Sequence, residues 1–288
     1  MTGGEIYEGK ANADGGAVYL EGGKVTISGG KIYRNVASNG NGGAISILGG
    51  SFLMNDTDAF ITQNAAFNSG SGASGNGGGI YISPDPSNSS ATVDVTLEKG
   101  NITGNSSDGN GGGVCVDMGS DNPAKLDVIV GEVSDNAATD ALKISGNNAQ
   151  IKGGGMYVNG ANASVTLNDG YVLDNRTSSY RVNQNIIVDG GLVTLKKPGI
   201  TTQVTITFNN NAQYYIQGGT DVLLEPQYVV ADSMCQLNAN EFVGGLNAYY
   251  SKFKGWNTRR DGKGTSYTDG QISSFNEDIT LYAQWANE

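Results

Sequence analysis

The chain has 288 residues, of which 45 are glycine and none is histidine, and its formal net charge is −11. The lack of histidine excludes nucleophile activation, general-base catalysis and metal binding by imidazole, and the acidic charge argues against nucleic acid and anionic membranes as partners. Glycine at about twice the average share, with few charged residues, favours a turn-rich all-β chain.

Residues 1–196 repeat a Gly-Gly-x-apolar motif. Its copies begin at Gly15, Gly42, Gly77, Gly111, Gly153 and Gly190, with spacings of 27, 35, 34, 42 and 37 residues. The shortest copy contains three short alternating segments separated by Gly or Asn turns, as expected for one coil of a solenoid whose inner face is buried only against its neighbours. The repeats therefore predict a right-handed parallel β-helix (β-solenoid) over residues 1–196.

A second motif, apolar-x-x-Asn, falls between the glycine pairs. We expect its asparagines to occupy equivalent corners of successive coils and to satisfy buried turn amides by hydrogen bonding to one another. This predicted structural ladder consists of Asn35, Asn64, Asn105, Asn136 and Asn175.

The strand after each glycine pair has a two-residue period, which assigns each side chain to a face. Apolar pairs such as Val18 and Leu20 are expected to point inward, and the residue between them outward. The predicted outward column is Tyr19, Ser46, Tyr81, Cys115 and Tyr157. Its tyrosines, Tyr19, Tyr81 and Tyr157, are either a stripe on which a glycan stacks or a surface ladder that stabilises neighbouring coils. The second interpretation is favoured, because the serine and the cysteine interrupt the column.

The alternating Gly-Gly-Ala-(Ile/Val) and apolar-x-x-Asn motifs resemble the repeats of chlamydial polymorphic membrane proteins and related bacterial β-helical adhesins. That family has phenylalanine three residues before its asparagine, where this chain has Ile or Val. The resemblance implies an adhesin-like β-helix for residues 1–196.

A different pattern follows the break at residues 196–203. Phe253-Lys-Gly-Trp-Asn-Thr, then Asp261-Gly-Lys-Gly-Thr-Ser-Tyr and Leu281-Tyr-Ala-Gln-Trp, are very similar to the Listeria–Bacteroides repeat, also called the internalin B-repeat. The resemblance implies a small β-grasp-like domain over residues 203–288, of a kind found in surface proteins and often in tandem. Residues 209–250 are longer and less regular than the middle of that family.

No catalytic, cofactor-binding or metal site is predicted. The acidic stretches 55–58 and 108–110 match no calcium-binding motif and are interpreted as turns. Asp174, Arg176 and Arg181 form the one charged cluster worth inspection for catalysis. Parallel β-helices also host polysaccharide lyases and glycoside hydrolases, so a carbohydrate-active β-helix enzyme remains the alternative, although fold analogy alone does not support activity.

The sequence thus predicts a non-catalytic, adhesin-like segment of an extracellular bacterial cell-surface protein, without cofactor. The β-helix would display side loops, which commonly carry the binding function of solenoids, to a host surface protein or glycan, and the second domain would be a stalk or spacer. No apolar run is long enough for membrane insertion. Because Met1 is followed at once by repeat-like sequence, further repeat modules are expected outside this segment.

Overall fold

The computed structural model describes residues 1–70, 75–85, 93–119, 126–131, 142–178, 184–242 and 245–287, without the side chains of residues 126, 127 and 234. The chain divides into two compact units, Met1–Thr202 (unit 1) and Gln203–Glu288 (unit 2). Strands make up almost all of the regular structure, and the one helix among the described residues is the single turn α1 (Ala212–Tyr215). The chain is therefore all-β, as predicted.

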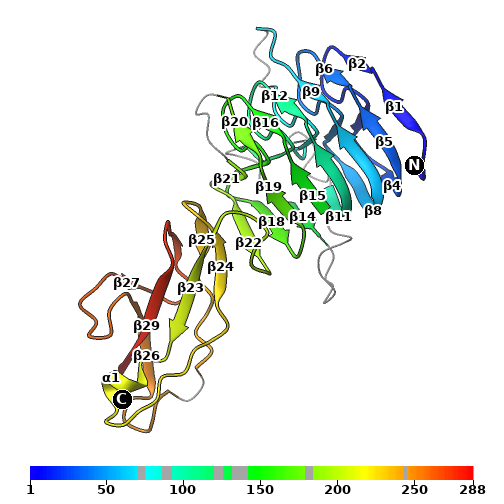
Figure 1. Cartoon of the computed structure of the whole chain (residues 1–288). Helices are drawn as coiled ribbons and strands as arrows, with labels where there is room; N and C mark the ends of the chain where they lie inside the picture. Colours follow the sequence, from blue (N-terminus) through cyan, green and yellow to red (C-terminus); the bar gives the residue numbers. More distant parts are fainter. Residues whose placement is uncertain are drawn as a thin grey trace. The chain divides into compact units, whose positions relative to one another are not determined.

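Unit 1 consists of three parallel sheets (Figure 1). The long sheet contains β1 (Glu5–Tyr7), β4 (Lys24–Ile27), β5 (Gly30–Tyr33), β8 (Gly50–Thr62), β11 (Val93–Thr103), β14 (Leu126–Val130), β15 (Leu142–Ser145), β18 (Ala163–Leu167), β19 (Tyr171–Leu173) and β22 (Leu192–Leu195). The corner sheet contains β2 (Lys10–Ala11), β6 (Val36–Ala37), β9 (Ala65–Ala66), β12 (Ser106–Ser107), β16 (Asn148–Ala149) and β20 (Arg176–Thr177). The glycine-pair sheet contains β3 (Val18–Leu20), β7 (Ile45–Ile47), β10 (Ile80–Ile82), β13 (Val114–Asp117), β17 (Met156–Asn159) and β21 (Ile186–Asp189).

The chain visits these sheets in a fixed order. From β3 it enters the long sheet at β4 and β5, passes the corner sheet at β6 and returns to the glycine-pair sheet at β7. Each such passage is called a circuit below. Strands from successive circuits pair in parallel, for example β7 with β10 and β10 with β13.

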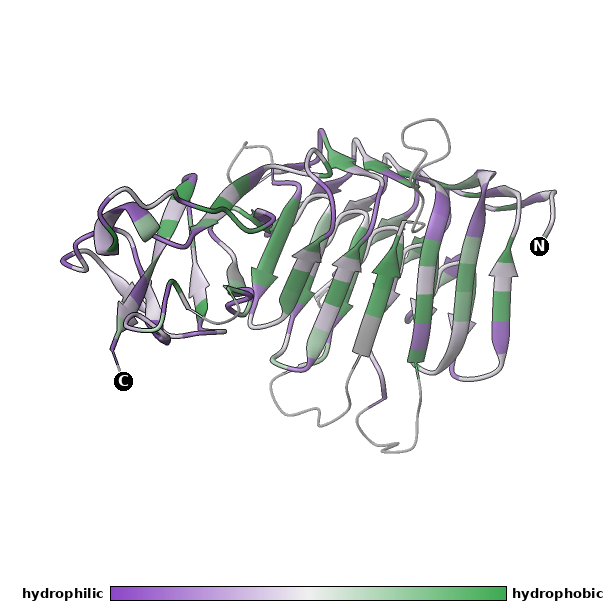
Figure 2. Ribbon diagram, turned by 90° about the horizontal axis from the view of Figure 1, so that it is seen from below, coloured by the Kyte–Doolittle hydropathy of each residue, from purple (hydrophilic) through white to green (hydrophobic). Residues whose placement is uncertain are grey.

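Equivalent apolar residues of successive circuits lie side by side, and alternation along each strand separates the two faces (Figure 2). In the long sheet, Ile32, Ile61, Ile102 and Ile144 are in register, and all are 0–1% exposed. The glycine-pair sheet contains an equivalent column, and all of its residues are fully buried: Ile45, Ile80, Val114 and Met156. These columns form one continuous apolar core.

The second glycine of each pair allows the backbone of neighbouring segments to approach closely. A Cβ atom on Gly43 would lie 2.4 Å from the carbonyl carbon of Ala65 in β9. One on Gly112 would lie 2.5 Å from the carbonyl carbon of Asn148 in β16 and 2.5 Å from the carbonyl oxygen of Gly154. Any side chain at these positions would force the corner sheet and the glycine-pair sheet apart.

Unit 2 is a mixed sheet with its own core. Its strands are β23 (Gln203–Asn209), β24 (Gln227–Val230), β26 (Lys252–Asn257), β27 (Ser266–Tyr267) and β29 (Ile279–Ala286), with a separate pair β25 (Met234–Gln236) and β28 (Ile272–Ser274). β23 and β29 pair in parallel, and β24, β26 and β27 add antiparallel neighbours. Phe208 and Trp256 meet edge to face with ring centroids 4.8 Å apart, and Trp285 and Leu281 complete this core.

Candidate functional site

A column of buried asparagines follows the corner of unit 1. The backbone N–H and the side-chain Nδ2 of Asn64 both donate to Oδ1 of Asn105, at 2.9 Å each. The same pair of hydrogen bonds joins Asn105 to Asn147, at 2.9 and 3.0 Å, and Asn147 to Asn175, at 3.0 Å each. Asn35 begins the column below Asn64, and Asn185 follows Asn175 through bonds of 3.1 and 3.3 Å.

Each of these amides is also tied to the strand beneath it. The second Nδ2 hydrogen of Asn105 is donated to the carbonyl oxygen of Ile61 at 2.9 Å, and that of Asn147 to Ile102 at 2.8 Å. With Oδ1 accepting twice and Nδ2 donating twice, the side chain uses its full capacity. The column therefore acts as a structural device and presents no polar group to a ligand.

One member of the column, Asn147, was not predicted from the sequence. Asn136 lies outside the described residues, and the position above Asn105 is occupied by Asn147. The 42-residue repeat contains two apolar-x-x-Asn sequences, and the register of β11 with β15 pairs Ile102 with Ile144, three residues before Asn147. Asn35, Asn64, Asn105 and Asn175 lie in the column as expected.

A second polar column was missed by the sequence analysis. The residues before the first three glycine pairs each accept a hydrogen bond from the counterpart in the next circuit. Asp14 Oδ1 accepts from Asn41 N at 2.7 Å, Asn41 Oδ1 from Asn76 N at 2.9 Å, and Asn76 Oδ1 from Asn110 N at 2.8 Å. The signal was present, since Asp or Asn precedes four successive glycine pairs in the sequence.

The predicted outward tyrosine column does not form an exposed stripe. Tyr19 is 48% exposed, but Tyr157 is 7% exposed, and the intervening Ser46 and Cys115 are fully buried. In register, Ser46 separates Tyr19 from Tyr81, and Cys115 separates Tyr81 from Tyr157. The expectation that all five residues face solvent was therefore wrong, and neither a stacking stripe nor a tyrosine ladder exists there.

The glycine turn before each of the first five strands of this sheet lies close to the residue of this column in the same circuit. Gly111 has a φ of 65°, and a Cβ there would lie 2.7 Å from Cβ of Cys115. In the same way, a Cβ atom on Gly153 would lie 3.0 Å from Cβ of Tyr157. At Gly15, Gly111 and Gly153, the first glycine of the pair thus places its backbone against the residue four positions later, in a positive-φ conformation that glycine adopts without strain.

Ionic groups gather at one place on the outer side of this sheet. Asp189 Oδ2 accepts from Lys152 Nζ at 2.6 Å and from the Tyr157 hydroxyl at 2.9 Å. Burial, followed by the hydrogen bond to Asp189, raises the pKa of Tyr157, so this hydroxyl stays protonated at neutral pH. It can donate a hydrogen bond but is a poor general base.

The other charged segments singled out in the sequence do not form a comparable cluster of ionic side chains among the described residues. Asp174 and Arg176 lie on the described chain, Asp174 at a φ of 57°, whereas Arg181 lies outside the described residues. The stretch 55–58 was predicted to be a turn but lies within strand β8, where Asp56 Oδ1 accepts from Asp58 N at 2.8 Å. No group of three or more metal-ligating side chains occurs within the described ranges. Cys115 and Cys235 are free and buried.

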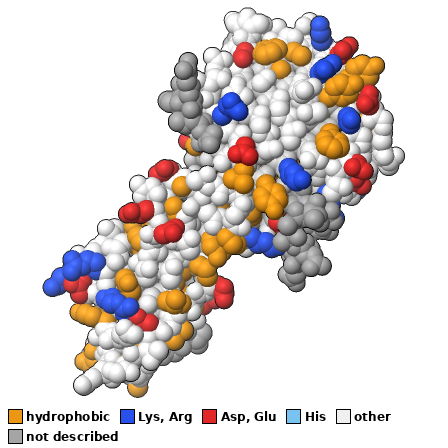
Figure 3. All heavy atoms as spheres, viewed as in Figure 1, with side chains coloured by type: hydrophobic (Ala, Val, Ile, Leu, Met, Phe, Trp, Pro, Cys, Tyr) orange, Lys and Arg blue, Asp and Glu red, His pale blue; other side chains and the backbone are white. Residues whose placement is uncertain are grey.

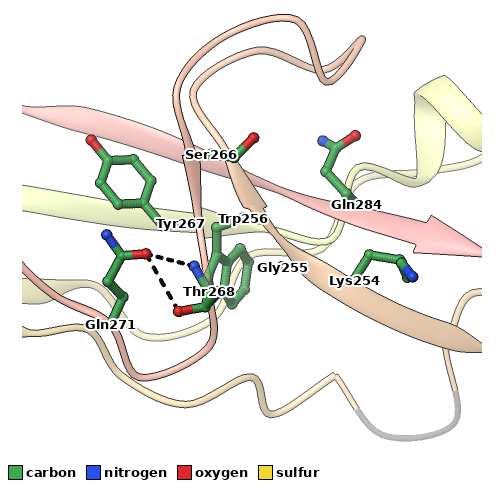
Figure 4. Close-up of a pocket in the computed structure, with 8 residues that line it drawn as sticks. All are labelled: Lys254, Gly255, Trp256, Ser266, Tyr267, Thr268, Gln271 and Gln284. Carbon is green, nitrogen blue, oxygen red and sulfur yellow. Dashed lines mark hydrogen bonds between the residues drawn. The ribbon is translucent and has the colours of Figure 1, made fainter.

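Unit 2 contains a shallow hollow of about 270 Å³ around Gly255 (Figure 4). Part of its polar lining is already engaged, whereas the indole N–H of Trp256 has no hydrogen-bond partner among the described residues. Gln271 Oε1 accepts from the backbone and hydroxyl of Thr268 at 2.8 and 3.4 Å, and Ser266 Oγ accepts from Asn257 Nδ2 at 2.9 Å. Asn257 Nδ2 also donates to the carbonyl oxygens of Gly262 and Gly264 and so holds the loop that follows. The Trp-Asn-Thr and Gly-x-Gly motifs therefore have a structural role.

Comparison with known families identifies one segment. The model of the Listeria-Bacteroides repeat domain matches residues 247–284, which lie within unit 2. The resemblance of unit 1 to polymorphic membrane proteins is not supported by a family match, and neither curated proteins nor solved structures give a significant match. Repeats of this family are typical of surface-associated bacterial proteins. Within the described residues, no helix has the length and apolar character needed to cross a membrane.

Proposed function

We propose that this chain is a non-catalytic, adhesin-like segment of an extracellular protein of the bacterial cell surface. Unit 1 would be a right-handed parallel β-helix, with the hand that nearly all parallel crossover connections adopt, and it would hold its side loops out to a host surface protein or glycan. Unit 2 would be a β-grasp-like module of the same surface protein. The observation that carries the proposal is the Listeria-Bacteroides repeat match at residues 247–284.

The interior of unit 1 supports a role as a stiff carrier. Asn64, Asn105 and Asn147 are 0–1% exposed, and each links its circuit to the next through two hydrogen bonds. Buried, satisfied polar networks rigidify a core. On the face drawn in Figure 3, acidic and basic side chains are interspersed, which suits display at a surface better than binding to a polyanion.

A screen of the purified chain against immobilised glycans and extracellular-matrix proteins tests the proposal. We expect saturable binding to at least one of these ligands, and surface labelling of intact producing cells by an antibody against the chain. A chain that binds no ligand and is found only inside the cells would contradict it.

A carbohydrate-active β-helix enzyme is the second candidate, and the contacts among Lys152, Asp189 and Tyr157 are the observation that favours it. Polysaccharide lyases and glycoside hydrolases need a base or paired carboxylates, and this cluster supplies one carboxylate shared by two donors. Release of reducing ends or unsaturated products from polysaccharides, lost in Asp189→Asn, would support the enzyme over the adhesin.

A further inference from the structure

Four tyrosines of unit 2 form an unbroken aromatic cluster. Tyr214 and Tyr215 belong to α1, and Tyr249 and Tyr250 lie in a turn closed by the hydrogen bond from the backbone N–H of Leu246 to the carbonyl oxygen of Tyr250 at 2.9 Å. Ring centroids are 5.1 Å apart for Tyr214 and Tyr215, 4.9 Å for Tyr215 and Tyr250, and 4.8 Å for Tyr249 and Tyr250. Two segments more than thirty residues apart in the sequence are thereby joined through their rings.

The two inner rings are held in place. The Tyr215 hydroxyl donates to Gln284 Oε1 at 3.1 Å and accepts from the backbone N–H of Trp285 at 3.2 Å. The turn carrying Tyr250 is fixed by Asn247, whose Oδ1 accepts from the backbone N–H groups of Tyr249 and Tyr250 at 2.9 and 2.8 Å. A ligand that met these rings would lose little free energy to ordering them.

The two outer rings face solvent. Tyr214 is 52% exposed and Tyr249 is 59% exposed, whereas the inner rings are half-buried. The outer rings stand at 85° and 90° to their inner neighbours, so their contacts are edge-to-face and neither outer ring lies in a parallel stack. Aromatic faces of this kind take up the apolar faces of other rings by dispersion and CH–π contact.

The size and polarity of the cluster indicate its ligand. A tyrosine has about 150–250 Å² to bury, so two half-exposed rings offer roughly 250 Å², far below the ~800 Å² per partner of a stable protein interface. An area of this size suits a small ligand rather than a protein surface. The polar side chains that hydrogen-bond to these segments are uncharged amides: Gln284 accepts from the Tyr215 hydroxyl, and Asn247 accepts from the backbone of Tyr249. Uncharged amides and tyrosine hydroxyls favour a neutral ligand over a charged one.

We infer that the tyrosine cluster of Tyr214, Tyr215, Tyr249 and Tyr250 binds the pyranose rings of a neutral glycan. The exposed rings of Tyr214 and Tyr249 stack on the sugars, and Tyr215 and Tyr250 form the fixed base on which they stand. This site lies in unit 2 and is separate from the side loops through which unit 1 is proposed to make contact.

The test uses the full chain on an array of immobilised neutral oligosaccharides of glucose, galactose, mannose and N-acetylhexosamines, with sialylated and uronate-containing chains alongside. We expect the wild type to bind at least one neutral oligosaccharide. The double variant Tyr214→Ala/Tyr249→Ala should bind that oligosaccharide about tenfold more weakly or not at all. Tyr214→Phe/Tyr249→Phe should retain most of the affinity, because it keeps both ring faces.

Ile272→Ala is the matched control, since Ile272 is a 52% exposed apolar residue of the same unit outside the cluster. It should bind as the wild type does, and all variants should keep the wild-type thermal midpoint. Three results would overturn the inference: no binding to any neutral oligosaccharide, unchanged binding by the double alanine variant, or binding confined to charged chains. Tyrosine-dependent capture of a matrix protein without glycan binding would assign the cluster to a protein partner instead.

Discussion

Asn105 donates two hydrogen bonds to one atom of Asn147, from its backbone N–H at 2.9 Å and from its side-chain Nδ2 at 3.0 Å, although 42 positions separate the two residues. A single oxygen in one circuit thus orients both the backbone and the side chain of the circuit before it. Because the same relation recurs along the column, removing one side chain interrupts the network on both sides.

Asn105→Leu is expected to destabilise unit 1 by about 1–3 kcal/mol, because it leaves the backbone N–H and the Nδ2 group of Asn64 without their shared acceptor. It also removes one of the two donors to Asn147 Oδ1, which keeps only the backbone N–H of residue 105. For a unit of this size, each kcal/mol lowers the thermal midpoint by about 2–4 °C. Circular dichroism during heating measures the change. Asn12→Leu, at an exposed position, should shift the midpoint little. Equal midpoints for Asn105→Leu and the wild type would contradict the ladder.

Two glycine-to-alanine substitutions test whether the second glycine of a pair is required by close backbone packing. Gly112→Ala places a methyl group 2.5 Å from the backbone of both Asn148 and Gly154, and we expect a loss of about 1–3 kcal/mol from overpacking. Gly22→Ala has nothing within 4 Å and should be neutral or slightly stabilising, because it removes freedom from the unfolded chain. Chemical denaturation of the two variants checks this. If they unfolded at the same denaturant concentration, close backbone approach would not be the reason for the second glycine.

The sequence carried most of the architecture, because periodic features act locally and repeat. Two-residue alternation predicted the buried columns of Ile45 and Ile80, and the first five glycine pairs marked the start of a circuit. The sixth pair, Gly190-Gly191, instead lies between β21 of the glycine-pair sheet and β22 of the long sheet. The strand register within a long insertion could not be predicted from this periodicity. Asn136 and Asn147 both follow the motif, and only pairing of Ile144 with Ile102 selects the second.

Side-chain exposure was harder to predict than strand direction. Alternation placed Cys115 and Tyr157 opposite the core-facing residues, but it did not reveal that both are buried, whereas Tyr19 in the same column is exposed. The tyrosine cluster of unit 2 was also out of reach. It depends on the meeting of α1 with the turn that contains Tyr250, a tertiary contact with no periodic signature in the sequence.

Unit 2 should lose stability in acid through Asp221. Burial opposes ionisation of this carboxyl, but hydrogen bonds from Arg260, the backbone of Gln213 and Asn209 together lower its pKa below the ordinary 3.8. A lowered pKa in the folded state adds stability above the unfolded value, and this is lost as pH falls through the folded value. The thermal midpoint of the wild type should therefore approach that of Asp221→Asn as pH drops from about 5 towards 2.

Asp232→Asn provides the control for that experiment, because Asp232 is an exposed aspartate of the same unit. Its midpoint should follow that of the wild type at every pH. A constant gap between wild type and Asp221→Asn down to the lowest pH would show that the carboxylate charge is not what stabilises the contact with Arg260.

Residues 203–288 expressed alone are expected to fold. The chain has two tryptophans, and both Trp256 and Trp285 lie in the core of this unit, with Phe208 fully buried beside them. A segment of this length can support an independent core. Tryptophan emission should report a cooperative unfolding transition in the isolated segment, and the same transition in the full chain. Phe208→Ala should abolish or sharply weaken it, because deleting a buried phenylalanine costs about 3–5 kcal/mol. A gradual, non-cooperative change in emission from the wild-type segment would show that the core of unit 2 depends on unit 1.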